Sequence, residues 1–372
     1  MTGVVGSGVV GSGVPARSGD RITEVAGITV GHAGRLDDHV VVGTLTEPGS
    51  GWATGTTVVS VPDGATTAVD VRGGGPGTRE TDLLDASNTV RGAHAIVLTG
   101  GSAYGLAAAD GVMGALEKQG RGLFMDLLGH TVPIVPAAVV YDLPVGGWEN
   151  RPDATFGADA YAAAAADFTI GTVGAGTGAR AGALKGGVGT ASVTLDDGPA
   201  RGLTVGAVVV ANPVGAVIDP ATGLPWGVED LAHFGLSTPD PAEIEAYAAL
   251  NAKGTVLNTT IGVVATDAAL PVASLKRLAM AGHDGLGRAI RPAHSPMDGD
   301  TLFAVATGAT PADPDAAVPM PPGMDPDAPV VAALCEQSAI VVQRAVVSAV
   351  LAATGVADVP AYRDVVPSAV GG

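Results

Sequence analysis

The sequence contains a single cysteine, Cys335, in 372 residues. One cysteine excludes an internal disulfide and any metal cluster that is built on cysteine ligands. It falls in the apolar stretch 330–354, which predicts a small core residue. The N-terminal residues MTGVVGSGVVGSGV also lack the basic and continuous apolar segments of a secretory signal. These absences favour a protein of the reducing cytoplasm.

Positive charge is scarce as well. The chain has 19 lysines and arginines against 37 aspartates and glutamates, which gives a formal net charge of −18. A chain this acidic lacks the basic surface that binds phosphate backbones, so we expect no nucleic-acid partner. No run of about 18 uninterrupted apolar residues is present, so we expect no membrane-spanning segment.

Aromatic residues make up only 3% of a chain that is 47% hydrophobic, so the core must consist mainly of Ala, Val, Leu and Ile. Glycine and proline are abundant, with 56 and 26 residues, and they predict many turns and close backbone approaches. Residues 1–21 contain VVGSG twice, which is typical of a flexible tail, and residues 22–372 are expected to form one domain.

Alternating and helical apolar patterns predict both strands and helices, which is typical of layered α and β packing. We expect strands at 54–62, 66–75, 92–101, 132–143, 182–195, 202–219, 254–267 and 301–308. We expect helices at 102–118, 154–167, 239–250, 271–290 and 329–355.

Seven histidines are scattered along the chain, and none forms an HExxH pair or another close pair of metal ligands. The sequence therefore supports neither a metal site nor a Ser-His-Asp triad. Two glycine-rich segments, at 72–82 and 99–105, match neither GxxxxGK[ST] nor GxGxxG. We expect turns there whose N–H groups line a substrate pocket, and we expect no cofactor. The histidines are His32, His39, His94, His130, His233, His283 and His294.

A polar trio, Asn258-Thr259-Thr260, interrupts the apolar run GTVLNTTIGVV. One interpretation is an ordinary strand edge or tight turn. The other is that the chain is cut between Asn258 and Thr259, because an N-terminal threonine carries its own base, the α-amine. The Thr259 hydroxyl would attack the carbonyl of Asn258, and water would open the resulting ester. Cleavage would leave residues 1–258 as a larger piece and residues 259–372 as a smaller one.

Four other polar residues lie in apolar or glycine-rich surroundings. Lys185, in ALKGGVG, is either an exposed hairpin charge or a cation aimed into a crowded site. Asn212, in VVVANPVGAV, is either part of a proline-associated turn or an amide donor for an oxyanion. Asp298 and Asp300, in SPMDGDTLFAV, are typical of a solvated turn or a weak cation site. If this segment is extended, one carboxylate could touch a catalytic group while the other braces the loop or holds a lysine.

Seven segments, taken together and in order, resemble one family. They are similar to the self-processing N-terminal-nucleophile peptidases, which include D-aminopeptidase/esterases, β-peptidyl aminopeptidases and the nylon-oligomer (6-aminohexanoate) endohydrolase. The resemblance implies an αββα sandwich, a precursor cut once into two pieces that stay together, and homo-oligomers of those pairs, often tetramers. The segments are ITEVAGITVGHA, VDVRGGGPGTRETDLL, AIVLTGGSAYGLAAADGV, VVYDLPVGG, VVVANPVGAVID, NTTIGVVATDA and DGDTLFAVATG.

Carried over by motif, the resemblance implies roles for single residues. Thr259 would be the nucleophile, freed by cleavage after Asn258. Asn212 of ANPVG would supply the oxyanion hole, and Lys185 would match a lysine near the nucleophile in the nylon-hydrolase branch.

The same resemblance implies that Asp298 and Asp300 orient and polarise the threonine hydroxyl and amine. Tyr141 of VVYD would line the site, and Gly100 and Gly101 would shape the pocket wall. Aminopeptidase members commonly combine a serine nucleophile with Ser and Glu at the positions of Asp298 and Asp300. The combination of Thr, Asp and Asp here resembles the nylon-oligomer branch.

The sequence thus predicts an N-terminal threonine amidohydrolase that acts on small linear amides such as nylon oligomers. Three alternatives stay open: an aminopeptidase that releases N-terminal D-, L- or β-amino acids, an acyl transferase with the same nucleophile, and a non-enzymatic scaffold. An amine acceptor that outcompetes water would mark the transferase. A chain that stays intact and tolerates changes at Lys185 would mark the scaffold.

Overall fold

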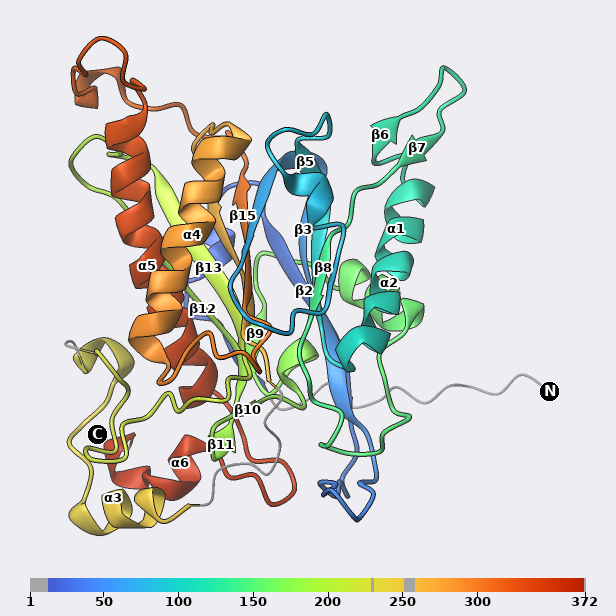
Figure 1. Ribbon diagram of the computed structural model, residues 1–372, viewed down its shortest axis with the longest axis vertical. Coiled ribbons are helices and arrows are strands. Elements are labelled where there is room, and N and C mark those ends of the chain that lie inside the picture. The colour runs from blue at the N-terminus through green and yellow to red at the C-terminus, as the bar shows by residue number, and fades with distance from the viewer. Residues whose placement is uncertain (1–12, 229–230, 251–257, 371–372) are drawn as a thin grey trace.

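The structure of the protein is a computed structural model that describes residues 13–228, 231–250 and 258–370. Two groups of helices enclose a large mixed sheet (Figure 1). Helices α4 (Val272–Ala289) and α5 (Ala328–Leu351) lie on one side of the sheet, and α1 (Ala108–Lys118) and α2 (Ala154–Ala162) lie on the other.

Eleven strands form this sheet in the order β1-β9-β12-β13-β14-β15-β3-β5-β8-β4, and β2 pairs with β3 outside that path. The pairs β14–β15 and β5–β8 are parallel, whereas the other pairs are antiparallel. The strands are β1 (Gly13–Pro15), β2 (Thr29–Leu36), β3 (Ala53–Val71), β4 (Thr78–Arg79), β5 (Gly92–Thr99), β8 (Ala137–Val139), β9 (Thr169–Gly171), β12 (Gly187–Thr194), β13 (Thr204–Ala211), β14 (Ile261–Thr266) and β15 (Thr301–Ala306). Two short hairpins, β6 (Leu123–Phe124) with β7 (Thr131–Val132) and β10 (Arg180–Ala181) with β11 (Leu184–Lys185), lie apart from it.

The long strand β3 joins the two halves of the sheet. Its first part, up to Ser60, pairs with β2 and β5, and its last part, from Thr66, pairs with β15. The register with β5 shifts between Ser60 and Ala65, and such a bulge re-aims a strand. One long strand therefore replaces the two separate strands that we predicted at 54–62 and 66–75.

Three apolar clusters separate four layers. Alternate side chains of a strand point to opposite faces, and on β13 Val209 packs with α4 and α5 while Val208 packs with the other sheet half. In that central cluster Val208 is joined by Ile96 and Leu98 of β5. The opposite face of β5 presents Val97 to α1 and α2. The order helix, sheet, sheet, helix confirms the expected αββα sandwich.

The spacing of apolar residues explains how the helices lie on the sheet. Helix α4 buries Leu275, Leu278, Gly282 and Leu286, which fall on one face because they follow one another at intervals of three or four residues. The start of α2 is capped by the Asp153 side chain, which accepts from the Thr155 N–H at 2.9 Å. Two short helices, α3 (Pro241–Ala248) and α6 (Tyr362–Val365), pack against each other below the main layers (Figure 1).

The edges of several elements differ from the sequence-based predictions. Residues 1–12 of the predicted tail lie outside the described residues, and Gly13–Pro15 pair with β9, so the sheet extends into the tail. Of the strand predicted at 132–143, Val132 pairs in the hairpin of β6 and β7, and Ala137–Val139 pair in the main sheet. Pro133 and Pro136 precede that pairing, and proline offers no N–H to a strand ladder.

Helix α5 is long and apolar enough to cross a membrane by length and composition. In this fold, however, it packs against α4, β12 and β13. Leu334, Val342 and Val346 are fully buried in that contact. The contact accounts for the apolar character of the helix without a membrane.

Candidate active site

Three strand ends meet at one edge of the sheet and bring predicted site residues together. Strands β14 and β15 run parallel and in register, so the residues that precede them lie side by side. Strand β13 runs antiparallel to β14, so its end lies at the same edge. Asn258-Thr259, the segment 298–300 and Asn212 are therefore neighbours, although they are far apart in the sequence.

The peptide bond between Asn258 and Thr259 is contacted by two donors at its carbonyl oxygen. The buried Thr259 hydroxyl donates a short hydrogen bond to the Asn258 carbonyl oxygen. The backbone N–H of Gly299 donates to the same oxygen at 3.1 Å. The Thr259 N–H in turn donates to the Asn212 carbonyl oxygen at 3.1 Å. A hydroxyl and an N–H donor thus converge on one carbonyl group. The hydroxyl lies next to that carbonyl, and the N–H is placed to stabilise negative charge on its oxygen.

Asn212 follows the last residue of β13, and its side chain is buried. Its Oδ1 accepts from the Arg180 N–H at 2.9 Å, and its Nδ2 donates to the Tyr141 carbonyl oxygen at 3.3 Å. The amide side chain therefore ties the end of β13 to two other segments of the chain, which a simple turn residue would not do.

Asp300 is buried and contacts the residue that follows the predicted nucleophile. Its Oδ1 accepts from the Thr260 N–H at 2.7 Å. Its Oδ2 accepts from the backbone N–H of His294 at 3.1 Å and lies 2.8 Å from the ring Nδ1 of the same residue. Asp300 therefore fixes the backbone beside Thr259.

Asp298 braces the adjoining loop. Its Oδ1 accepts from the Val214 N–H at 3.2 Å, and its Oδ2 accepts from the N–H and the hydroxyl of Ser295 at 3.1 and 2.6 Å. Burial raises the pKa of the Asp298 carboxyl, and the charge of Asp300 adds to this effect. Catalytic roles for the two aspartates stay predictions.

The glycine run 73–75 packs against the backbone of residues 296–300. A Cβ atom on Gly73 would lie 2.3 Å from the Asp300 nitrogen, and the Gly75 N–H donates to the Asp298 carbonyl oxygen at 2.8 Å. No side chain fits between the two segments, so glycine is required by close backbone approach. The glycine run packs against the DGD segment (residues 298–300), and this contact accounts for the glycines without a phosphate ligand.

A cavity of about 830 Å³ adjoins this edge. Tyr141 and Arg180, which hold the Asn212 side chain, both line it. Burial raises the pKa of the Tyr141 phenol. Other parts of the wall are apolar, with Leu45, Leu143, Pro144 and Trp148, or acidic, with Glu47 and Asp358.

The sequence matches the model of peptidase family S58 over residues 20–362. The chain belongs to peptidase family S58. A Mycobacterium tuberculosis protein described as an uncharacterized aminopeptidase is 54% identical over 354 residues, covering 94% of this chain and 99% of that protein. The 6-aminohexanoate-oligomer endohydrolase of Kocuria sp. is 35% identical over 307 residues, covering 79% of this chain and 78% of the enzyme.

The fold of this S58 chain is similar to a solved aminopeptidase structure. The L-aminopeptidase D-Ala-esterase/amidase of Ochrobactrum anthropi, described as a variant of the Ntn-hydrolase fold, matches with a TM-score of 0.60 and 21% identity. The match covers 92% of this chain and 88% of that one. Family and relatives together make the S58 chain an aminopeptidase-like hydrolase of peptide or amide bonds.

Lys185 of this peptidase is fully buried, which decides against an exposed hairpin charge. Its Nζ donates to the carbonyl oxygens of Gly176 and Gly186 at 2.7 and 2.9 Å. Burial lowers its pKa to about 7, although the charge of Asp142 opposes that shift. Asp142 is buried as well, and burial raises its pKa to about 6.

Replacement of Lys185 by Met should remove a pH dependence of stability. An unfolded lysine titrates near ~10.4, so between about pH 7 and about pH 10 the unfolded chain binds one proton more than the folded chain. The free energy of unfolding should therefore rise with pH in this window, and the variant should lack a few kcal/mol of that rise. Urea unfolding at several pH values measures it, with Thr259→Ala added to every protein so that the predicted cut cannot divide the chain. The exposed Lys118, changed to Met, is the matched control; equal pH slopes in all three proteins would contradict the assignment.

The two predicted pocket glycines, Gly100 and Gly101, lie against the Asp142 carboxylate. The Gly101 N–H donates to its Oδ1 at 2.6 Å, and a Cβ on Gly100 would lie 2.2 Å from its Oδ2. Thr54 donates to Oδ2 at 2.7 Å. Neither glycine is among the residues that line the large cavity, so their role as a pocket wall stays a prediction.

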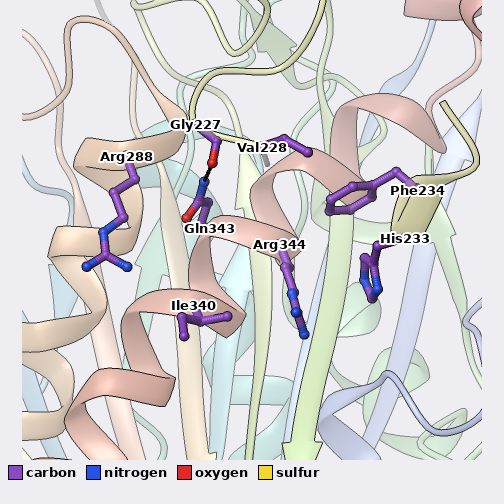
Figure 2. Close-up of a pocket in the computed structure, with 8 residues that line it drawn as sticks. All are labelled: Gly227, Val228, His233, Phe234, Arg288, Ile340, Gln343 and Arg344. Atoms are coloured by element: carbon purple, nitrogen blue, oxygen red, sulfur yellow. Dashed lines mark hydrogen bonds between the residues drawn. The ribbon is translucent and has the colours of Figure 1, made fainter. Parts of the chain in front are cut away.

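A second cavity of about 390 Å³ lies on the outer side of α4 and α5 (Figure 2). Arg288 projects from α4, and Gln343 and Arg344 project from α5. The Gln343 amide donates to the Gly227 carbonyl oxygen at 2.8 Å. None of the predicted site residues lines it. Over the described residues, no group of three or more His, Cys, Asp or Glu side chains could hold a metal ion.

Three residues at the site were missed by the sequence analysis. His294 and Ser295 lie just before the DGD segment and form hydrogen bonds with its two carboxylates. Asp142 follows Tyr141, and its charge raises the pKa of Lys185 against the effect of burial. The signal was available for the first two, since polar residues clustered before a strand face the same edge as the strand's start. Asp142 gave no signal, because its partners lie 41 and 88 residues away in the chain.

Proposed function

We propose that this S58 peptidase is a self-processing N-terminal threonine amidohydrolase, cut between Asn258 and Thr259. The observation that carries the proposal is the convergence of the Thr259 hydroxyl and the Gly299 N–H on the Asn258 carbonyl oxygen. A strand edge would not require either contact.

In the first reaction the Thr259 Oγ attacks the Asn258 carbonyl carbon. The Gly299 N–H stabilises the negative charge that develops on the oxygen. The C–N bond breaks, the hydroxyl proton passes to the departing nitrogen, and an ester joins Asn258 to the Thr259 side chain. Water then hydrolyses the ester, which leaves the Asn258 carboxylate, the free hydroxyl and a new α-amine.

In the second reaction the Thr259 α-amine accepts the hydroxyl proton while Oγ attacks the carbonyl of a substrate amide. An unperturbed α-amine has a pKa of ~7.7–8.0, which suits a base near neutral pH. The Asn212 amide is the proposed donor to the substrate oxyanion. The proton passes to the leaving amine, and water releases the acid from the acyl-enzyme.

The proposed substrates are small linear amides, with nylon-type 6-aminohexanoate oligomers as the first candidate. Threonine with two aspartates and the name of the 35% identical Kocuria relative support that choice. The name of the 54% identical Mycobacterium relative favours the second candidate, an aminopeptidase. The large cavity, which is lined by the Asn212 partners Tyr141 and Arg180, offers an apolar wall for a methylene chain and charged groups for polar ends.

A panel of blocked and unblocked substrates separates the two candidates. An aminopeptidase needs a free terminal amine, so N-acetylation should abolish its turnover, whereas an endohydrolase should cut inside an N-acetylated 6-aminohexanoate tetramer. Mass spectrometry of the products reads out the bond that is cut. Adding a primary amine shows whether the acyl group goes to an acceptor, as a transferase requires.

We further propose a cytoplasmic homo-oligomer, a tetramer of cleaved pairs. The hairpin of β6 and β7 supports self-association, since it projects from the fold and exposes a cluster of large apolar side chains (Figure 1). Apolar side chains gathered at one exposed site mark interaction surfaces. They are Leu123, Phe124, Met125, Leu127, Leu128 and Val132.

Replacement of Leu127 and Leu128 by Asp should lower the mass of the assembly. Both side chains are exposed in the single chain, so the change should leave the fold and the cut after Asn258 intact. Light scattering after size exclusion measures the assembly. Met324→Asp, at another exposed apolar residue, is the control and should not change the mass. An unaltered assembly in the double variant would exclude the hairpin as the contact.

A further inference from the structure

His294 occupies the loop between α4 and β15 and contacts Asp300 twice. Its backbone N–H donates to Asp300 Oδ2 at 3.1 Å, and its ring Nδ1 lies 2.8 Å from the same oxygen. The ring Nε2 lies 3.4 Å from the carbonyl oxygen of His283. The two ring nitrogens therefore each face an acceptor. Both hydrogen bonds form only when both nitrogens carry a hydrogen, which makes the ring an imidazolium.

The surroundings of His294 agree with a positive charge. Burial lowers its pKa, but the hydrogen bond and charge of Asp300 outweigh that effect, and the pKa lies above its usual value. The neighbouring His283 ring lies at 4.9 Å, edge to face. Its Nε2 donates to the Asp70 carbonyl oxygen at 3.0 Å, and burial lowers its pKa to about 4, so it stays neutral and does not repel His294.

The remaining charged groups near this ring have other partners. Arg72 donates to the Asp70 carboxylate at 2.7 Å and to the Met280 carbonyl oxygen at 3.2 Å. Asp298 is bonded to Ser295, as described above. Among the described residues, His294 is the one cationic side chain in contact with Asp300.

The other oxygen of Asp300 bonds the residue next to the proposed nucleophile. Oδ1 accepts from the Thr260 N–H at 2.7 Å, and Thr260 directly follows Thr259. We propose that His294 is a positioning residue for Thr259. The imidazolium of His294 fixes Asp300 and thereby the Thr260 backbone beside the nucleophile. This inference rests on the proposed function, since the contact between Asp300 and Thr260 positions Thr259 for catalysis only if Thr259 is the nucleophile.

The charge of the His294–Asp300 hydrogen bond determines how its loss should affect the reaction rate. Hydrogen bonds between an imidazolium and a carboxylate are stronger than neutral ones, so the charged pair limits the positions that Asp300 can take. Loss of that limit lets the Thr260 backbone drift, and drift of a nucleophile lowers the reaction rate rather than the binding of substrate. Because the histidine pKa is raised, the effect should be present at low pH and should fade as pH rises through it.

Self-cleavage of freshly synthesised chain tests the proposal without any substrate. Cell-free synthesis with a labelled amino acid, followed by a chase, gives the first-order rate constant from gel bands. His294→Ala removes both side-chain contacts, whereas His294→Asn keeps an N–H donor close to the position of Nδ1. His39→Asn, at an exposed residue, is the matched control. Thermal unfolding of each variant is recorded alongside.

We expect His294→Ala to slow self-cleavage about tenfold at neutral pH and His294→Asn to recover most of that loss. The ratio of the wild-type rate to the His294→Asn rate should fall from about pH 6 to about pH 9, because only the wild type loses a proton at this position. After processing, His294→Ala should lower kcat and leave KM unchanged on a substrate found with the panel above.

Three results would overturn the proposal: His294→Ala cleaving at the wild-type rate, His294→Asn as slow as His294→Ala, or a deficit that does not change with pH and follows the loss of thermal stability. Failure of the proposed function looks different. In that case the wild type is not cut, or Thr259→Ala is cut at the wild-type rate, whatever the His294 variants do.

Discussion

Replacement of Thr259 by Ala should abolish both self-cleavage and amide hydrolysis. The alanine lacks the hydroxyl that contacts the Asn258 carbonyl oxygen, so no ester can form and no α-amine is released. The side chain is small and buried, and removing its hydroxyl and methyl group should leave the fold intact. Gel analysis should show one chain, and turnover on any substrate of the wild type should fall to background.

Thr259→Ser is the matched control for this result. Serine keeps the hydroxyl and removes only the methyl group, so we expect cleavage at the same bond and residual turnover. An alanine variant that retains substantial turnover would contradict the assignment of the nucleophile. A serine variant that folds and yet stays uncut would show that the methyl group is required to hold the hydroxyl in place.

Replacement of Gly299 by Ala should slow self-cleavage by about 10²-fold, the loss that follows removal of one oxyanion donor. The Gly299 N–H donates to the Asn258 carbonyl oxygen. An added Cβ would lie 2.8 Å from the Gly75 carbonyl oxygen and 2.9 Å from the Thr259 Oγ, so the backbone must shift and carry the N–H away. Pulse-chase measurement of the uncut fraction gives the rate.

Gly287→Ala is the control for this prediction. A Cβ on Gly287, in helix α4, meets nothing within 4 Å, so the variant should cleave like the wild type. If the Gly299→Ala variant cleaves at an unchanged rate and unfolds at an unchanged midpoint, the Gly299 N–H does not stabilise the oxyanion of self-cleavage.

Much of the fold could be predicted because its patterns are local. The apolar spacing of α4 and the buried run of β5 gave bounds close to those of the structure. The bulge in β3 could not be predicted in this way, since the pairing of its two parts with β5 and β15 depends on contacts far away in the chain. The strand predicted at 132–143 was too long for a different reason, since Pro133 and Pro136 precede the three residues of β8.

The site was predictable in part for the same physical reason. A polar trio in an apolar strand and an Asn at the end of another gave Thr259 and Asn212, and strand pairing brings them together. His294 and Ser295, which bond the carboxylates of Asp300 and Asp298, could have been inferred from the polar residues clustered before β15. The Val214 N–H, which also bonds Asp298, could not be inferred, because it lies 84 residues away in the chain. The glycine run 73–75 packs against the backbone of Asp298 and Asp300 from a distant part of the chain, and no local pattern predicts that contact.

The most direct test of the central claim is the intact mass of the wild type under denaturing conditions, with the N-terminal sequence of each species. Cleavage after Asn258 would divide the 36.2 kDa chain into 258 and 114 residues, or about 25 and about 11 kDa. The account predicts these two species in the active enzyme, with the smaller one beginning Thr-Thr-Ile-Gly. A single chain of 36.2 kDa in active enzyme, or a new N-terminus at another residue, would contradict it.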